Sequence, residues 1–143
     1  MRVRLTRALG RALLALASSA TILSGPQAAS ASPETCVTPA GPPFGTYICD
    51  YEPTIIEWPD GHRQWFVVGT DVSNQVWTSW EYAYDRWTNW EPLGGTARSE
   101  VICVTCVETN PYAPLHQLYD NHLAIEVVGT TGRFYELDWW PGG

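Results

Sequence analysis

The chain has 143 residues, of which 45% are hydrophobic, and its formal net charge is −7. This length suits a single domain. An excess of acidic residues repels phosphate backbones, so we expect no nucleic-acid partner.

The first 31 residues have the plan of a secretory signal peptide. Four arginines precede the apolar run Ala12–Leu23, and Ala29-Ser30-Ala31 fits the A-x-A cleavage pattern. The run has 12 residues, whereas a membrane helix needs about 20, so a membrane-anchored N-terminus is the less favoured alternative. Cleavage after Ala31 leaves four arginines, no lysine and fifteen acidic residues, a net charge of −11. We therefore expect a secreted, extracellular protein that does not insert into a membrane.

All four cysteines lie in the part that would be exported, and an even number in a small secreted chain predicts two disulfides. Cys103 and Cys106 lie in the strand-like run Val101–Val107, where three residues span about 10 Å. A disulfide needs Cα atoms within about 7 Å, so a local bridge would require a turn or bulge. The sequence favours bridges from Cys36 and Cys49 to this strand, with Cys36–Cys49 plus Cys103–Cys106 as the alternative.

The same cysteine pair also begins a loose zinc pattern, C-x2-C-x9-H-x5-H, which His116 and His122 complete. Export favours oxidised cysteines over metal ligands. We therefore expect neither a metal nor any other cofactor.

Two stretches of different character follow the leader. Residues 32–53 are expected to form an extended N-terminal segment with one short strand near Gly45–Tyr51. Residues 54–95 are expected to form a unit of four antiparallel strands, because aromatic and β-branched runs alternate with turn signals such as Pro59-Asp60-Gly61. The expected strands are Thr54–Trp58, Arg63–Val68, Gln75–Trp80 and Arg86–Glu91.

Residues 96–143 partly repeat this unit. Asp60–Thr70 aligns without gaps on Asp120–Thr130, with 6 of 11 positions identical and an offset of 60 residues. Short β-units that recur at such intervals are typical of propeller blades. The expected strands are Glu100–Glu108, His122–Val128 and Arg133–Trp140, with an insertion at Thr109–Tyr119. No segment after the leader repeats at 3.6 residues, so we predict an all-β fold of about seven antiparallel strands, stapled by disulfides.

The pattern (P)DG-x4-FVVGTD … VW-x2-W … W-x2-W-x-PLGG resembles the repeat of PLL-type β-propeller lectins, which are fucose-binding bacterial proteins. The same repeat occurs in many secreted actinobacterial proteins. In the first unit the matching residues are Asp60-Gly61, Phe66–Asp71, Val76-Trp77, Trp80, Trp87, Trp90 and Pro92–Gly95; in the second they are Asp120, Val127–Thr130, Tyr135 and Trp139.

The resemblance implies an incomplete propeller, because the family's closed rings have several blades and this chain has about one and a half. We favour a compact β-sheet domain. A ring assembled from several chains and a degenerate relic held by its disulfides are the alternatives.

Four tryptophans, Trp77, Trp80, Trp87 and Trp90, are spaced as W-x2-W-x6-W-x2-W. A spacing of three along a strand places partners on opposite faces, so we expect one ring of each pair in the core and the other outside. An outward indole can stack on the apolar face of a sugar while nearby polar groups bind the hydroxyls. The candidate ligand-binding residues are Trp77, Trp80, Tyr82, Tyr84, Arg86, Trp87, Asn89 and Trp90.

Catalysis has little support. Glu81, Asp85 and Glu91 come closest to the carboxylate pair of a glycosidase, but Glu81 and Asp85 flank a turn, where acids are ordinarily solvated. There is no G-x-S-x-G motif and no phosphate-binding glycine loop. We therefore expect no enzyme but a lectin-like module, and the resemblance implies fucose-like or O-methylated sugars as ligands. Weak single sites would gain from several copies, which favours a homo-oligomer or clustered glycans. The alternative is an extracellular structural or protein-interaction domain with the same fold and no sugar binding.

Overall fold

The computed structural model describes residues 3–4, 32–38, 41–71, 73–108 and 115–140, and this part of the chain is all-β, without a helix. It contains thirteen short strands rather than about seven. They are β1 (Val3–Arg4), β2 (Thr35–Val37), β3 (Thr46–Ile48), β4 (Thr54–Glu57), β5 (Arg63–Val68), β6 (Val76–Ala83), β7 (Arg86–Trp87), β8 (Glu91–Gly94), β9 (Ile102–Cys103), β10 (Cys106–Glu108), β11 (Leu115–Leu118), β12 (Leu123–Val128) and β13 (Phe134–Trp139).

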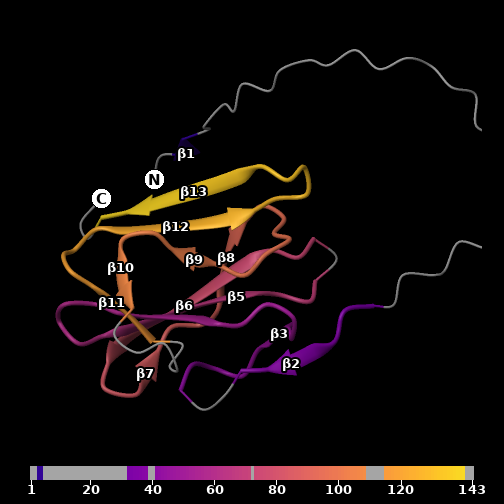
Figure 1. Cartoon of the computed structure of the whole chain (residues 1–143). Helices are drawn as coiled ribbons and strands as arrows, with labels where there is room; N and C mark the ends of the chain where they lie inside the picture. Colours follow the sequence, from indigo (N-terminus) through magenta and orange to yellow (C-terminus); the bar gives the residue numbers. More distant parts are fainter. Residues whose placement is uncertain (1–2, 5–31, 39–40, 72, 109–114, 141–143) are drawn as a thin grey trace, which may run out of the picture.

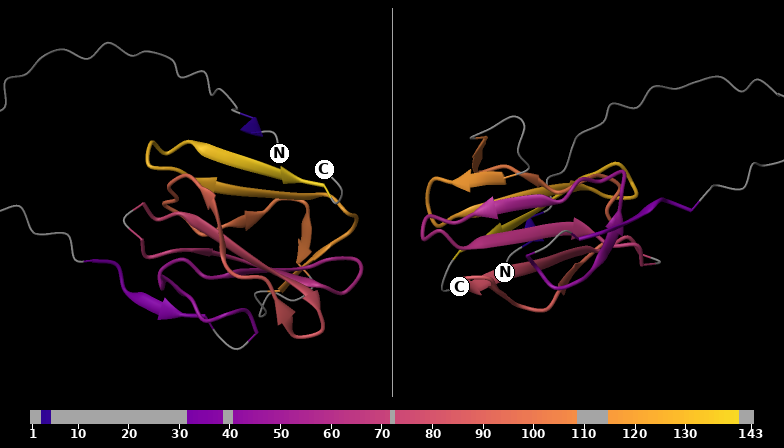
Figure 2. Two further views of the ribbon diagram at one scale, coloured as in Figure 1. Left: turned by 180° about the vertical axis from the view of Figure 1, so that it is seen from behind. Right: turned by 90° about the horizontal axis from the view of Figure 1, so that it is seen from below.

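The strands form three layers, which Figure 1 shows one above another and Figure 2 shows from behind and from below. The first sheet has the order β10-β11-β4-β5-β6-β7, with β8 also paired to β6. The second sheet, β1-β13-β12-β9, covers one face of the first. The N-terminal hairpin, β2–β3, lies on the opposite side. The pairing is antiparallel except between β11 and β4.

The main core lies between the facing sides of the two sheets. Because side chains alternate along a strand, β4 and β5 direct Ile56, Phe66 and Val68 to this side, where each is at most 1% exposed. They belong to one cluster with Leu123 and Ile125 of β12. The hydrophobic runs that predict the strands therefore also form the contact between the two repeated units.

In this core, both polar atoms of one buried side chain have hydrogen-bond partners. Gln64 is 2% exposed. Its Oε1 accepts a hydrogen bond from Trp58 Nε1 at 3.1 Å, and its Nε2 donates to Thr78 Oγ1 at 3.0 Å. Thr78 in turn donates to the Trp65 carbonyl at 2.9 Å. The chain of bonds offsets the cost of removing these groups from water.

The repeated segments share the same local geometry. The His62 and His122 amides donate to Asp60 and Asp120 carboxylates at 3.0 and 2.9 Å, which closes the turn before β5 and before β12. The following hairpins have the same register. Val68 pairs with Val76 as Val128 pairs with Phe134, so positions on β13 correspond to those on β6 with an offset of 58.

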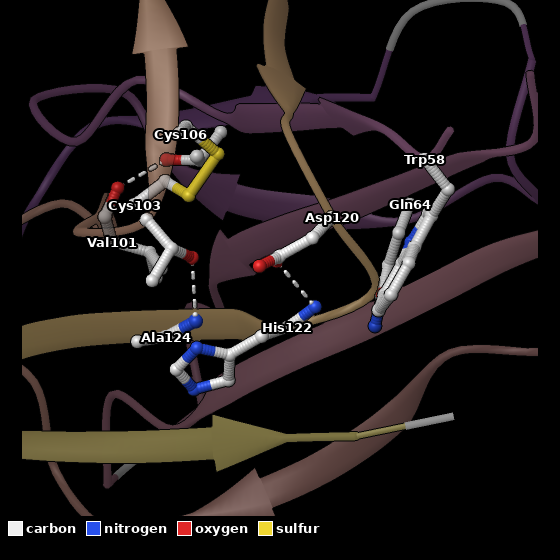
Figure 3. The surroundings of a disulfide bond; sticks show 10 residues. Trp58, Gln64, Val101, Cys103, Cys106, Asp120, His122 and Ala124 are labelled. Carbon is white, nitrogen blue, oxygen red and sulfur yellow. Dashed lines mark hydrogen bonds between the residues drawn. A yellow bond between two sulfur atoms is a disulfide. The ribbon is translucent and has the colours of Figure 1, made fainter. Parts of the chain in front are cut away.

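The disulfides are Cys36–Cys49 and Cys103–Cys106, so the favoured pairing across the chain is wrong and the alternative is correct. The expected strand Glu100–Glu108 is interrupted at Val104 and Thr105. Its halves are β9, which joins the second sheet, and β10, which joins the first. This corner brings the two Cα atoms to 5.5 Å, within bridging distance. Figure 3 shows the bridge at the corner, with Ala124 beside it.

The N-terminal segment is more ordered than an extended leader. Residues 35–37 and 46–48 pair as a hairpin, and Ile48 is 2% exposed within the main cluster. The Cys36–Cys49 bridge closes this loop with a Cα separation of 5.0 Å. The hairpin forms the third layer beside the end of β5, where Tyr47 bridges Gly69, and Ile48 reaches the main core from there.

Other boundaries differ more modestly. The prediction for β5 is correct, but β6 continues to Ala83, and the expected strand Arg86–Glu91 divides into β7 and β8. The end of the expected insertion forms β11, whereas residues 109–114 lie outside the described part. β1 falls within the expected signal peptide, of which the described part contains only residues 3–4.

Candidate functional site

Trp77 and Trp80 lie on opposite faces of β6, as their spacing predicts. Trp77 pairs with Val67 and Trp80 with Gln64 of β5. Trp80 faces the second sheet and meets Trp139 edge-on, with ring centroids 6.1 Å apart. Trp77 faces the N-terminal hairpin, and neither ring of β6 is fully buried.

Trp87 and Trp90 both contact the N-terminal segment. Residues 88–90 belong to no strand, so strand alternation does not separate the two rings. Trp90 Nε1 donates a hydrogen bond of 2.8 Å to the Pro43 carbonyl. The Trp87 ring lies beside Gly41, where an added Cβ would be 3.8 Å from it. The expectation that one ring of this pair enters the core between the sheets is therefore wrong.

A hollow of about 340 Å³ lies between the N-terminal hairpin and the first sheet. Its aromatic lining is Trp77 and Trp90, and we name it the Trp77 hollow. A Cβ at Gly69 would lie 2.6 Å from Trp77 Nε1, and one at Gly45 would lie 2.7 Å from Trp90 Nε1. Glycine at both positions is therefore what lets the indoles lie against the backbone.

Polar groups also line the Trp77 hollow. The hydroxyl oxygens of Thr46 and Thr70 are 3.2 Å apart, and either can donate to the other. Asp71 Oδ1 accepts a hydrogen bond from the Gln75 backbone N–H at 3.0 Å and one from the Ser73 hydroxyl at 3.2 Å. These bonds fix the position of the carboxylate. The hollow thus combines flat apolar rings with hydroxyl and carboxylate oxygens, the combination that sugar binding needs.

The second unit forms a related pocket of about 390 Å³ where β6 and β8 meet β12 and β13. An isolated β-bridge joins Tyr47 to Gly69 beside the Trp77 hollow, and another joins Ala97 to Gly129 beside this pocket. The two bridges occupy equivalent places in the two units. We name it the Tyr135 pocket, because Tyr135 lies against Gly129 as Trp77 lies against Gly69. The corresponding lining residues are Gly45 and Gly95, Thr46 and Thr96, Val67 and Val127, Thr70 and Thr130, and Trp77 and Tyr135.

The four smaller candidates do not reach the Trp77 hollow. Tyr82 and Tyr84 are 58% and 89% exposed at the other end of β6, and Arg86 and Asn89 are exposed in the segment that follows. Tyr82 lies five positions beyond Trp77, which is roughly 16 Å along a strand. The structure therefore groups Trp77 with Trp90 and leaves these residues apart.

Glu81 stabilises the β6–β7 turn. Only 4% of its side chain is exposed. Its carboxylate accepts from Arg63 Nε at 3.0 Å and from the Asp85 amide at 2.8 Å. The hydrogen bond from Arg63 is the main cause that holds the pKa of Glu81 below its usual value of 4.5, against the opposing effect of burial. The Arg63 guanidinium also lies over the Trp87 ring, 5.3 Å from its centroid.

Sequence reasoning missed the small residues of the hollow. Gly45 and Thr46 lie in the segment that we expected to be extended, and Thr70 and Asp71 in a turn. A signal for them exists, because Gly-Thr occurs at positions 45–46, 69–70, 95–96 and 129–130. Two of these dipeptides lie at the Trp77 hollow and two at the Tyr135 pocket.

A scan against protein-family models and a search of curated proteins found no match to this chain. In the described residues, no three metal-binding side chains cluster, and both cysteines of the zinc pattern are oxidised. No helix of sufficient length and apolarity to cross a membrane occurs in the same residues.

Proposed function

We propose that this protein is a secreted, non-catalytic carbohydrate-binding module that holds a sugar in the Trp77 hollow. The two units would be propeller-blade-like repeats in a compact, incomplete propeller. The leader pattern and the two disulfides support export to an oxidising environment.

The Trp77 hollow is the observation on which the proposal depends. Its volume of about 340 Å³ lies at the small end of the roughly 300–1,000 Å³ range of ligand pockets. Trp77 and Trp90 offer flat apolar surface, and Thr46, Thr70 and Asp71 offer hydrogen-bonding oxygens. The indoles are held by glycine contacts and by the Pro43 carbonyl. Such a site would need little rearrangement to bind.

The resemblance to fucose-binding lectin repeats suggests the ligand class. Fucose-like and O-methylated sugars carry a methyl group beside their hydroxyls, and the indole rings would contact that methyl group. The competing proposal is an extracellular structural or protein-interaction domain. Exposed Tyr82 and Tyr84, outside the hollow, are the observation that favours it.

Glycan-array binding of the exported protein tests the proposal. We expect retention of fucosylated or O-methylated glycans, and a Trp77→Ala variant should bind at least about tenfold more weakly, a loss of about 1.4 kcal/mol. The matched control is Trp140→Ala, because Trp140 is 59% exposed and lies outside the hollow. Absence of glycan retention, or equal loss in both variants, would favour the protein-interaction alternative.

A further inference from the structure

Within the described part of the chain, one edge of the second sheet is paired over only two residues. β13 pairs with β12 through all residues from Phe134 to Trp139. On its other side, among the residues that the structure describes, only two pair with it, Val3 with Leu137 and Arg4 with Glu136. Figure 1 shows the short β1 beside the long β13. We name this outer side of β13 the β13 edge.

In the first unit, the equivalent strand edge is paired with another strand. β6 corresponds to β13, and its matching side is covered by β8, with Trp77 paired to Pro92 and Thr78 to Glu91. Tyr135 and Glu136 are the counterparts of Trp77 and Thr78. In the part of the chain that the structure describes, β1 therefore takes the place in the second unit that β8 takes in the first.

β13 lacks two common forms of edge protection. It contains no proline, and its pairing with β12 shows no register shift that would indicate a bulge. Its backbone donors and acceptors are thus arranged to receive another strand.

Charge selects which strand fits. Glu126 and Glu136 are paired in register, so their side chains share one face of the second sheet, and Asp138 lies on the same face. A second copy that paired through the β13 edge would place acids against acids, which is destabilising. A strand with arginine opposite Glu136 would instead be attracted, and Arg4 occupies this register.

We propose that the β13 edge is a docking site for an extended, arginine-containing polypeptide segment. The chain's own Val3–Arg4 fills the site before processing, and removal of residues 1–31 at export opens it. The site is distinct from the Trp77 hollow and does not depend on sugar binding.

The test uses the exported protein, after N-terminal sequencing has shown that it begins at Ser32. The probe is a fluorescent peptide with the sequence of residues 1–11, MRVRLTRALGR. We expect saturable binding by fluorescence anisotropy, together with slower amide hydrogen exchange in β13 and unchanged exchange in β5. A peptide with all four arginines replaced by glutamate should bind at least tenfold more weakly.

Matched protein variants separate docking from general attraction to an acidic protein. Glu136→Lys should weaken binding of the peptide at least tenfold, whereas Glu52→Lys, an equal charge change at an exposed loop residue, should leave it within twofold. Glu126→Lys provides a second variant should Glu136→Lys fold poorly. Retention of residues 3–4 after export, absence of peptide binding, equal effects of Glu136→Lys and Glu52→Lys, or protection outside β13 would overturn the proposal.

Discussion

At the scale of single residues, a few small or charged side chains decide how the tryptophans are used. Gly45 and Gly69 admit the Trp90 and Trp77 rings against the backbone. Arg63 covers the Trp87 ring instead. Rings of the same type, a few residues apart, therefore differ in whether a ligand can reach them.

Glu81→Gln should lower the free energy of unfolding by about 2 kcal/mol at pH 7, because it removes the buried negative charge that accepts hydrogen bonds from Arg63. The folded-state pKa of Glu81 lies below its usual 4.5. Its contribution is therefore present above about pH 4.5 and is lost as the pH falls through the folded-state pKa. Urea unfolding of both proteins between pH 7 and pH 3 should show the difference shrinking with acidification.

The control for this measurement is Glu91→Gln, since Glu91 is exposed on β8. It should change stability little at any pH. A gap between the wild type and Glu81→Gln that stayed constant down to pH 3 would contradict the assigned role of Glu81.

At the scale of elements, alternation and turn signals predict strands well where pairing is local. Arg63–Val68 is found as predicted because Asp60 and Gly61 define the preceding turn. The run Val101–Val107 reads as one strand, yet it divides between two sheets. That division depends on contacts with β12 and β11, which are distant in sequence, so the local pattern carries no sign of it.

In the candidate site, too, the sequence predicts the local geometry but not the contacts between segments distant in sequence. Strand spacing predicts the opposite faces of Trp77 and Trp80. It fails for Trp90, which lies beyond β7, and it offers no sign that residues 41–46 return to cover the first sheet. The part of the hollow contributed by Gly45 and Thr46 therefore requires the three-dimensional fold.

Removing the Cys36–Cys49 bridge should destabilise the third layer. The bridge closes a loop with a sequence separation of 13, and loops near this length are stabilised by about 3 kcal/mol. The double variant Cys36→Ser, Cys49→Ser should lower the melting temperature and speed hydrogen exchange in β3. The comparison is Cys103→Ser, Cys106→Ser, whose loop spans a separation of 3 and should leave exchange in β3 unchanged. Equal acceleration in β3 by both variants would contradict this division.

At the scale of the whole molecule, the two sheets can be compared face by face. The outer face of the second sheet corresponds to the face of the first sheet that the second sheet covers, but it carries acidic residues. The register equates positions on β5 and β6 with positions on β12 and β13. Three pairs change from apolar or neutral to acidic, namely Phe66 to Glu126, Thr78 to Glu136 and Trp80 to Asp138. Terminal repeats need a polar outer face to prevent further stacking. We therefore predict that the second sheet does not stack on another copy, in contrast to the homo-oligomer that weak single sites would favour.

The double variant Glu126→Phe, Asp138→Trp restores the apolar character of that face. We expect the wild type to sediment as a monomer and this variant to self-associate, because an exposed apolar patch favours association. A discrete small oligomer of the wild type would contradict the inference and favour a ring assembled from several chains.

The most direct measurement of the central claim is an NMR titration of the indole N–H resonances with methyl α-L-fucoside and an O-methylated analogue. Sugar binding in the Trp77 hollow predicts that the Trp77 and Trp90 signals move together and saturate, while those of Trp139 and Trp140 stay fixed. Indole signals that do not move at saturating sugar, or movement confined to Trp139 and Trp140, would contradict it.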